Sequence, residues 1–247
     1  NSEAAHEKLL LGFGGCEKTT KKIYDESKQV RHVALSLTGE PIAYPKINEL
    51  LEEFHKRKIS TFLVTNAQYP EQIEKIKNVT QFYISVDAPN KIKLKEIDQP
   101  LFTDFYERLL QSLDLMRNAS YRTCIRLTLV KGQNDLDLEG YKQLIERGDP
   151  DFIEVKGYMH VGASRKFLER DNMPMHNEVD DFTKRLIDEL EDYEIVSEHK
   201  ASRVLCLMHK RMNGKQYIDF SKFFEIVNSG KVAEALDYSS EKIMPNL

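Results

Sequence analysis

RHVALSLTGEPIAYP, residues 31–45, is the stretch that decides the fold. Its apolar run predicts a strand over 31–38 that is buried on both faces. Gly39 lets the backbone turn sharply and approach a ligand, Glu40 places a carboxylate at the carboxyl end of the strand, and Pro41 stiffens the exit from the turn. In a parallel α/β sheet or barrel, ligands bind at that edge. An ordinary strand-to-helix turn is the alternative interpretation of the same residues.

Strands and helices alternate along the rest of the chain. Apolar runs bounded by turn residues indicate strands, and apolar residues repeated every three or four positions indicate helices. The predicted strands cover 59–65, 80–86, 123–130 and 152–156, with a final pair at 193–198 and 203–208. The predicted helices cover 3–12, 46–57, 104–117, 138–147, 176–190 and 217–229, and residues 16–29 are predicted to form a loop or linker with one helical turn.

This order of elements predicts an α/β fold in the form of an incomplete (βα) TIM barrel. The connections are too short for a second domain between the strands, so the strands should form a parallel sheet with helices outside. The dinucleotide fingerprint G-x-G-x-x-G is absent from the sequence, which favours a barrel over a dinucleotide-binding fold. We expect a partial barrel over 1–210 and a C-terminal helical extension over 211–247.

Composition excludes several classes of protein. Hydrophobic residues make up 40% and charged residues 31% of the chain, and no apolar run approaches the ~20 residues of a membrane helix. The net charge of −4 gives no global basic footprint for nucleic acid. The three cysteines lie far apart without a C-x-x-C pair, which predicts a reducing compartment and no metal site within this chain. Since the first residues carry no basic leader, we expect a cytoplasmic protein.

Polar residues close almost every predicted strand. Because parallel strands end at one edge of a sheet, these side chains should converge there, as they do in barrel active sites. Asn66 and Asp87 are also common turn and capping residues, which is their structural alternative. A cation inside a buried strand is costly unless it is paired, so for Arg126 and Lys156 an internal ion pair, for example with Glu40 or Glu154, is the alternative to ligand binding. The full set is Glu40, Asn66, Asp87, Arg126 with Thr128, and Lys156.

Basic residues follow the last parallel strand. Tyr158 and Phe167 interleave with them, and stacking of an aromatic ring on an unpaired base is worth ~1–3 kcal/mol. His160 and Arg165 could contact a ligand. The alternative is a solvated charged face. The basic residues are Lys156, Arg165, Lys166 and Arg170 near the expected mouth, with Lys200, Arg203, Lys210 and Arg211 further along.

Six blocks of the sequence resemble one known family. They are HVALSLTGEPIAYPKINELLEEFH, TFLVTNAQYP, TQFYISVDAP, RLTLVKGQN, DPDFIEVKGYMHVGAS and SRVLCLMH, and they occur in the order found in the radical S-adenosylmethionine enzymes that make 4-demethylwyosine in phenylalanine tRNA. The resemblance covers about residues 4–230. The segment YIDFSKFFEIV is more similar to eukaryotic than to archaeal members.

The resemblance implies a site for S-adenosylmethionine. Gly39-Glu40-Pro41 matches the family motif that binds the methionyl amino group, where carbonyls and a carboxylate accept from an ammonium. By strand position, Asn66, Ser85 and Asp87 would bind the ribose and methionyl groups. Arg126 would pair with the methionyl carboxylate, and Thr128 belongs to the same set.

The resemblance also implies a reaction and its partners. A member of this family would be a radical carbon–carbon lyase of wybutosine biosynthesis that condenses N1-methylguanosine of tRNA-Phe with pyruvate, using an electron donor. Lys156 would act as the catalytic residue and bind the pyruvate carboxylate or a tRNA phosphate. Tyr158, His160 and Arg165 would contact substrate. A Schiff-base aldolase that uses Lys156, and a cluster-free barrel that only binds tRNA, are the alternative functions.

One departure from the family concerns iron. The family's C-x3-C-x2-C loop, which holds a [4Fe–4S] cluster, has no counterpart here, and Cys16 stands alone. We therefore expect the first barrel strand, the cluster loop, the second cluster and the Schiff-base lysine in sequence upstream of Asn1. FMN is expected only if a flavodoxin-like domain precedes them. As an isolated fragment, the chain should be inactive, and a degenerate relative without catalysis is the alternative.

Overall fold

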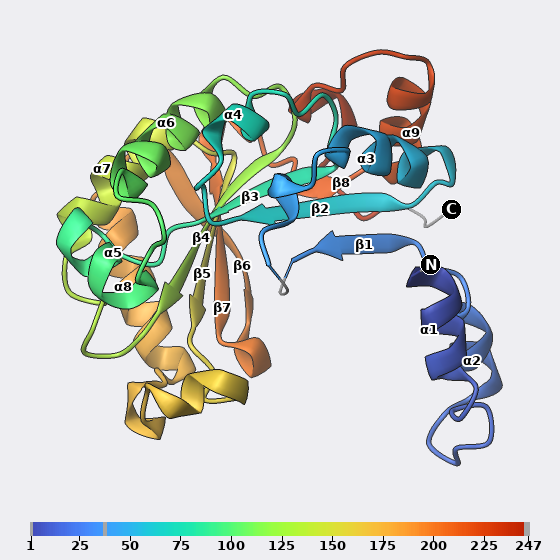
Figure 1. The fold of residues 1–247 in the computed structure, drawn as a ribbon, viewed down its shortest axis with the longest axis horizontal. Coiled ribbons are helices and arrows are strands. Elements are labelled where there is room, and N and C mark those ends of the chain that lie inside the picture. The colour runs from blue at the N-terminus through green and yellow to red at the C-terminus, as the bar shows by residue number, and fades with distance from the viewer. Residues whose placement is uncertain (1, 37–38, 245–247) are drawn as a thin grey trace.

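Five parallel strands and an antiparallel pair form one seven-stranded sheet. The structure is a computed structural model that describes residues 2–36 and 39–244. The strands follow the order β1-β2-β3-β4-β5-β7-β6, and each neighbouring pair from β1 to β5 is parallel. β1 and β6 are the two edges, so the described sheet is an open, incomplete barrel (Figure 1). The strands are β1 His32–Leu35, β2 Ser60–Thr65, β3 Gln81–Ser85, β4 Thr123–Leu129, β5 Phe152–Gly157, β6 Tyr193–His199 and β7 Val204–His209.

Helices cover the outer face of this sheet, as the barrel prediction requires. Figure 1 shows α4 to α8 on that face, while α1 and α2 stand apart beside the start of β1. The helices are α1 Ser2–Leu10, α2 Lys21–Ser27, α3 Ile47–Lys56, α4 Pro70–Ile73, α5 Lys91–Asp98, α6 Phe105–Arg117, α7 Leu138–Gly148, α8 His176–Asp188 and α9 Phe220–Asn228. No helix in the described ranges is long and apolar enough to span a membrane.

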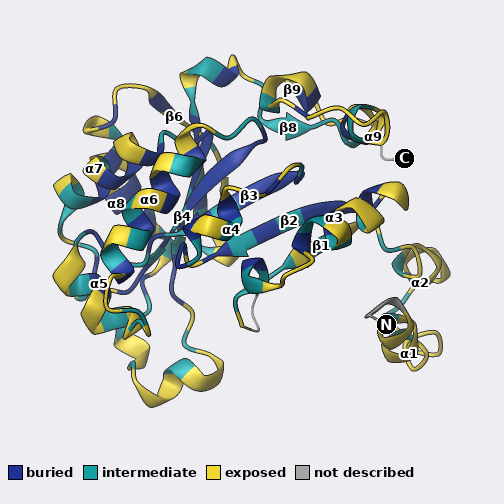
Figure 2. Cartoon of the chain, turned by 45° about the horizontal axis from the view of Figure 1, so that its top comes forward, coloured by how far each residue is buried: buried dark blue, intermediate teal, exposed yellow. Residues whose placement is uncertain are grey.

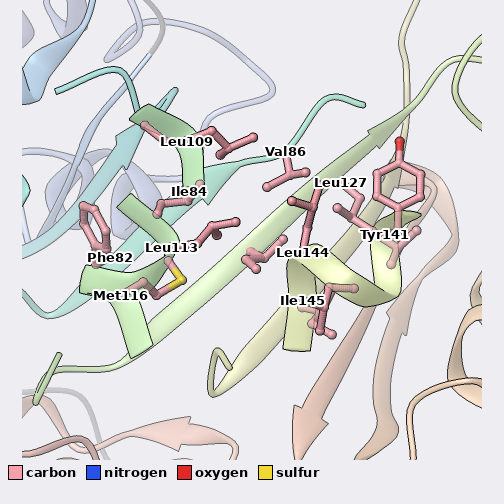
Figure 3. Packing of buried hydrophobic residues seen from close by; sticks show 14 of the residues in the cluster. Phe82, Ile84, Val86, Leu109, Leu113, Met116, Leu127, Tyr141, Leu144 and Ile145 are labelled. Atoms are coloured by element: carbon pink, nitrogen blue, oxygen red, sulfur yellow. The ribbon is translucent and has the colours of Figure 1, made fainter. Parts of the chain in front are cut away.

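The main core lies between the parallel strands and the outer helices. Figure 3 shows Leu109 and Leu113 of α6 packed near Ile84 of β3, and Ile145 of α7 on the same side of the sheet. Leu127 of β4 is fully buried in this cluster. Each fully buried aliphatic side chain contributes about 1.5–3 kcal/mol relative to exposure. This burial fixes the strand register and thus places the strand ends.

The strand in the decisive stretch is less buried than its sequence predicts. Of the four residues in β1, His32 and Ala34 are exposed and Val33 and Leu35 are half-buried (Figure 2). The prediction of burial on both faces is therefore wrong for the described part of the strand. The physical reason is position, because β1 is an edge strand that pairs only with β2 in the described structure. Residues 37–38, the predicted end of this strand, lie outside the described residues.

Three local predictions need correction, and one is confirmed. The predicted loop over 16–29 contains the helix α2. Thr20 caps the start of this helix, because its side chain accepts a hydrogen bond from the backbone N–H of Ile23. The helices α4 and α5 have no counterpart among the predicted helices. The predicted helix over 217–229 begins with a short strand, β8 Tyr217–Ile218, which pairs with β9 Ser239–Ser240 before α9 starts. The final strand pair is confirmed, and it runs antiparallel as β6 and β7.

The C-terminal segment packs against the amino-terminal end of the sheet. The hydroxyl of Tyr238, which is fully buried, accepts from the backbone N–H of Arg122 at 2.8 Å and donates to the carbonyl of Thr80 at 3.0 Å. The guanidinium of Arg122 donates to the Gln81 side chain at 3.3 Å and to the carbonyl of Gln216 at 3.0 Å. Residues after 210 are thus tied to β3 and β4. The boundary between 1–210 and 211–247 stays a prediction.

Candidate functional site

The carboxyl ends of β1 and β2 are joined by one side chain. The backbone N–H of Asn66 donates to Oε2 of Glu40 at 2.9 Å. Gly39 adopts φ +71°, a left-handed conformation that favours glycine, and no described atom lies within 4 Å of where its Cβ would be. Pro41 begins the 3-10 helix Pro41–Ala43. The turn is therefore rigid on one side of Glu40 and open on the other.

Glu40 has one carboxylate oxygen without a partner. Its Oε1 is buried and accepts no hydrogen bond from the described residues. Burial raises the pKa of Glu40, while the backbone N–H of Asn66, the hydroxyl of Thr65 and the backbone N–H of Ile42 lie close enough to the carboxylate to oppose that rise. A buried polar atom left unsatisfied costs about 1–3 kcal/mol. A ligand ammonium or hydroxyl donor would remove that cost, so this oxygen fits the amino group of a bound cofactor.

The ends of β3 and β4 hold a second group of predicted residues. The register pairs Ser85 with Arg126 in neighbouring strands. Desolvation raises the pKa of Asp87 to about 6, while the Arg126 charge and a hydrogen bond from Thr128 act in the opposite direction. Asp87 and Ser85 are half-buried. This group could accept hydrogen bonds from hydroxyl or amino donors of a ligand.

Asn134 connects these two strand ends and was missed by the sequence analysis. Its Nδ2 donates to the carbonyls of Asp87 and Thr128, both at 2.8 Å, and its Oδ1 accepts from the backbone N–H of Val130 at 2.7 Å. The side chain is buried. The only signal in the sequence is an asparagine in the polar turn after β4, which is typical of many turns. Asn134 therefore supports the position of Asp87 without itself being a predicted ligand contact.

Arg126 forms the internal ion pair that was the alternative to ligand binding. Its Nε donates to Oε1 of Glu154 at 3.1 Å, and its guanidinium lies 4.9 Å from the ring centroid of Tyr83. Both charged side chains keep about a quarter of their surface exposed. The pair leaves Nη1 of Arg126 without a hydrogen-bond partner in the part of the chain that the structure describes. The Nη1 group of the guanidinium is thus available to donate to a ligand carboxylate.

Lys156 lies beside this group without an ionic partner. The register pairs it with Thr128 of β4 and Val204 of β7, two residues beyond Glu154 on the same strand face. It is half-buried, and no carboxylate lies within 4.0 Å of its amino group in the described ranges. A half-buried ammonium without a partner is costly unless a ligand supplies one. This placement suits the carboxylate of a small acid or a phosphate.

The loop after β5 brings the other predicted substrate residues together. The Tyr158 hydroxyl is 3.3 Å from Nδ1 of His160 and donates to Oγ of Ser164 at 2.9 Å. Nε of Arg165 donates to the carbonyl of His160 at 3.2 Å. Tyr158 is buried, so its ring is a support for the loop more than an open stacking surface. His160 and Arg165 remain accessible.

A cavity of about 560 Å³ lies on the inner face of the sheet and includes Glu154, the partner of Arg126. Tyr83 and Glu154 line it, and so does Arg122, which the sequence did not predict and which donates to the C-terminal segment. Arg122 is 2% exposed and stacks on Phe152 at 4.3 Å. Its hydrogen bonds go to an amide side chain, a serine hydroxyl and two backbone carbonyls, so its charge faces no carboxylate within 4.0 Å in the described structure.

The described residues do not fit an iron–sulfur cluster. Cys16 is exposed on the amino-terminal segment, and Cys124 and Cys206 line the inner cavity. Burial raises the pKa of both inner thiols, which disfavours the thiolate that binds metal. No group of three His, Cys, Asp or Glu side chains within the described ranges is arranged to hold a metal ion.

Two protein families match the chain in adjacent segments. The radical SAM superfamily matches residues 16–145, and the family described as wyosine base formation matches residues 147–209. The S-adenosyl-L-methionine-dependent tRNA 4-demethylwyosine synthase of Oryza sativa subsp. japonica is 44% identical over 94% of this chain and 37% of its own length. The TYW1 protein of the same description from Mus musculus is 45% identical over 90% of this chain and 32% of its own length. The chain thus spans about one third of these curated relatives.

Two solved structures share the fold. A structure of TYW1 with a lysine–pyruvate adduct bound has a TM-score of 0.77 and 37% identity, over 85% of this chain and 67% of that chain. The crystal structure of archaeal TYW1 has a TM-score of 0.72 and 33% identity, over 85% of this chain and 68% of that chain. The incomplete barrel is therefore the fold of known radical SAM proteins.

Proposed function

The chain belongs to the radical SAM superfamily and to its family of tRNA 4-demethylwyosine synthases, and on that premise we propose that it carries the S-adenosylmethionine-binding and substrate-facing part of such an enzyme. The proposed reaction condenses N1-methylguanosine of tRNA-Phe with pyruvate in the wybutosine pathway. We place the protein in the cytoplasm. The single observation that carries the proposal is the buried Oε1 of Glu40, at the shared end of two parallel strands, which has no hydrogen-bond partner among the residues that the structure describes.

The ends of four strands, β1 to β4, would hold S-adenosylmethionine. The free oxygen of Glu40 and the open turn at Gly39-Glu40-Pro41 would receive the methionyl amino group. Asn66, Ser85 and Asp87, with Thr128 beside them, would accept or donate hydrogen bonds to the ribose and methionyl groups. Nη1 of Arg126 would bind the methionyl carboxylate while Nε stays with Glu154. When bound, this cofactor supplies the radical chemistry of the superfamily.

Lys156 and the loop after β5 would face the substrates. The unpaired ammonium of Lys156 would bind the carboxylate of pyruvate or a phosphate of the tRNA, and Tyr158, His160 and Arg165 would border the nucleotide. The lysine–pyruvate adduct bound to TYW1 supports pyruvate as the small substrate. The half-buried position of Lys156 would also limit water around the reacting atoms.

Other components of the reaction are proposed to come from sequence outside these 247 residues. The cysteines that the structure describes do not form a cluster site, so [4Fe–4S] ligands and the electron donor would be supplied elsewhere. FMN would be needed only if the donor is a flavodoxin-like domain. On this proposal the 247 residues are inactive alone.

The test measures product formation and cofactor binding in the complete enzyme. Arg126→Ala should weaken S-adenosylmethionine binding at least tenfold with the fold retained, since it removes the carboxylate contact and leaves Glu154 unpaired. The exposed Arg185→Ala is the matched control. Full activity with tRNA-Phe and pyruvate in the Arg126 variant would sink the assignment of the cofactor pocket.

A Schiff-base aldolase is the second candidate, and the unpaired amine of Lys156 favours it. In that case a carbonyl substrate would be trapped on Lys156 by borohydride without iron or S-adenosylmethionine. Trapping that is lost in Lys156→Met, together with product formation in the absence of iron, would replace the radical proposal. Trapping elsewhere, or none, favours the radical enzyme.

A further inference from the structure

Three arginines line one cavity beyond the end of β5. The cavity has a volume of about 330 Å³, and its wall includes Arg165, Arg170 and Arg203 together with His160. Figure 1 shows the short helices that carry Arg165 and Arg170 below the end of β5. Arg203 reaches the cavity from the turn between β6 and β7, so residues from two separate connections meet there.

No acidic side chain neutralises these arginines in the described structure. Nε of Arg165 donates to the carbonyl of His160, and Nη1 of Arg203 donates to the carbonyl of Pro174, both at 3.2 Å. Arg170 makes no side-chain hydrogen bond in the ranges described. The nearby Glu169 accepts from the backbone of its own short helix, and no ion pair links it to the three guanidinium groups.

Other basic residues of the same region have partners. Lys200 lies 3.4 Å from Glu198, and Arg211 pairs with Asp149 at 2.9 Å and with Asp151 at 3.2 Å. Lys210, like Arg165 and Arg203, donates to a backbone carbonyl, in its case that of Glu191, and it does not line this cavity. The three arginines that line the cavity therefore face no carboxylate in the described structure, whereas Arg211 pairs with two.

Like charges around one cavity repel each other, and an anion removes the repulsion. Guanidinium groups have a planar fork of donors that matches phosphate oxygens in a bidentate way. Met159 and Met173 add an apolar wall, which suits the sugar or base attached to a phosphate. We propose that this cavity binds one backbone phosphate of the substrate RNA, an inference that rests on the proposed function. The phosphate would lie beside the nucleotide presented to Lys156.

Continuity with the site supports this position. The backbone N–H of Gly157 donates to the carbonyl of Arg203 at 2.9 Å, which anchors the cavity wall to the residue after Lys156. His160 joins the cavity to Tyr158 through the contact of 3.3 Å between the Tyr158 hydroxyl and Nδ1 of His160. A phosphate bound here would thus be fixed to the rim of the barrel and would set the register of the RNA.

The experiment measures tRNA affinity of the complete enzyme at several salt concentrations. Arg170→Gln and Arg203→Gln should each weaken tRNA binding about tenfold at 0.1 M salt. Each should reduce the slope of log affinity against log salt by about 1, the value for one phosphate contact. Because one phosphate is shared, the double variant should lose little more of the slope than either single variant. The exposed Arg185→Gln on α8 removes the same charge outside the cavity and serves as control.

Each outcome decides between the ideas. The phosphate site would be overturned if the salt slopes of tRNA affinity in the cavity variants equalled that of Arg185→Gln. If the wild-type enzyme still binds and modifies tRNA, the proposed function would remain intact. Wild-type enzyme that does not bind tRNA would overturn both. Inorganic phosphate that binds the wild type and not the double variant, while tRNA slopes stay equal, would assign the cavity to free phosphate and also overturn the proposal.

Discussion

Glu40 accepts the backbone N–H of Asn66 at 2.9 Å, so a single carboxylate fastens the ends of two adjacent parallel strands. Its other oxygen is buried and has no partner among the residues described. One half of the side chain is therefore structural and the other half is available. This division allows the two roles to be separated by substitution.

Replacing Glu40 by Gln should weaken S-adenosylmethionine binding more than it weakens the fold. The Gln side-chain oxygen can still accept from Asn66, while the charge that attracts an ammonium is lost. A hydrogen bond to a charged group is worth about 1.5–3 kcal/mol, so the dissociation constant should rise about 10- to 100-fold. Calorimetric titration of the complete enzyme measures it. The control is Glu52→Gln, at an exposed position on α3. Equal affinity in both variants would contradict the role of Glu40.

Asp87 should give the protein a stability that falls as pH rises. Desolvation raises its pKa from 3.8 to about 6, so between these values the folded protein holds a proton that the unfolded chain has lost. The free energy of unfolding that protonated Asp87 contributes is fully present below pH 3.8 and is lost as pH rises to about 6. Asp87→Asn should remove this loss, which urea unfolding between pH 4 and 7 would measure.

Nuclear magnetic resonance gives a second readout for the same substitution. The pKa of Asp98 is raised to about 7 by desolvation and by the negative charge of Asp87. Asp87→Asn should therefore lower the pKa of Asp98. An unchanged pKa of Asp98, together with an unchanged pH profile of unfolding, would show that the two carboxyls do not interact.

The sequence predicts the strand pattern well because each inner strand is an apolar run bounded by turn residues. β2 to β5 lie within one or two residues of their predicted bounds. The exposure of β1 could not be predicted, since burial depends on which strand lies at the edge and not on the composition of the run. The short strands β8 and β9 pair across about 20 residues, and two residues carry no periodicity.

Positions at the strand ends could be predicted, and their partners could not. Parallel topology places Glu40, Asp87 and Lys156 at one edge without further information. The register of β4 and β5 decides that Arg126 pairs with Glu154. The sequence does not give this register, so it could not distinguish Glu154 from Glu40 as the partner. Arg122 donates to the carbonyl of Gln216, almost a hundred positions later in the chain, and no local sequence pattern predicts such a contact.

Tyr238→Phe should destabilise the barrel although the residue lies in the C-terminal segment. Its hydroxyl accepts from the Arg122 backbone and donates to the Thr80 carbonyl, and both groups would lose a partner in a buried place. The free energy of unfolding should fall by about 2–3 kcal/mol. Urea unfolding with a single transition would show that this segment and the barrel unfold together.

The matched control for this substitution is Tyr217→Phe. Tyr217 is half-buried, and its hydroxyl makes no hydrogen bond in the described structure. Its loss should change the free energy of unfolding by less than about 0.5 kcal/mol. An equal effect of the two substitutions would contradict the role of the Tyr238 hydroxyl.

His55 should give a pH dependence opposite in sign to that of Asp87. Burial lowers its pKa from 6.5 to about 4, and its Nε2 lies 2.8 Å from Oγ1 of Thr61. Between these pH values the unfolded chain binds the extra proton, so the stability that neutral His55 contributes is complete above pH 6.5 and is lost as pH falls to 4. The loss should reach about 3 kcal/mol.

The test compares His55→Gln with His199→Gln, which replaces an exposed histidine. Chemical unfolding at pH 4.5 and pH 7 should show a smaller difference in His55→Gln than in the wild type, because the group that must take up a proton on unfolding is gone. His199→Gln should keep the wild-type difference. Since the ring of His55 also contacts Phe223 of α9 at 5.0 Å, acid should loosen α9 from α3 before the sheet unfolds. Protection factors of the α9 amides, which correct the exchange rates for their intrinsic pH dependence, should fall at pH 4.5 relative to pH 7, and equal protection at both pH values would contradict this order.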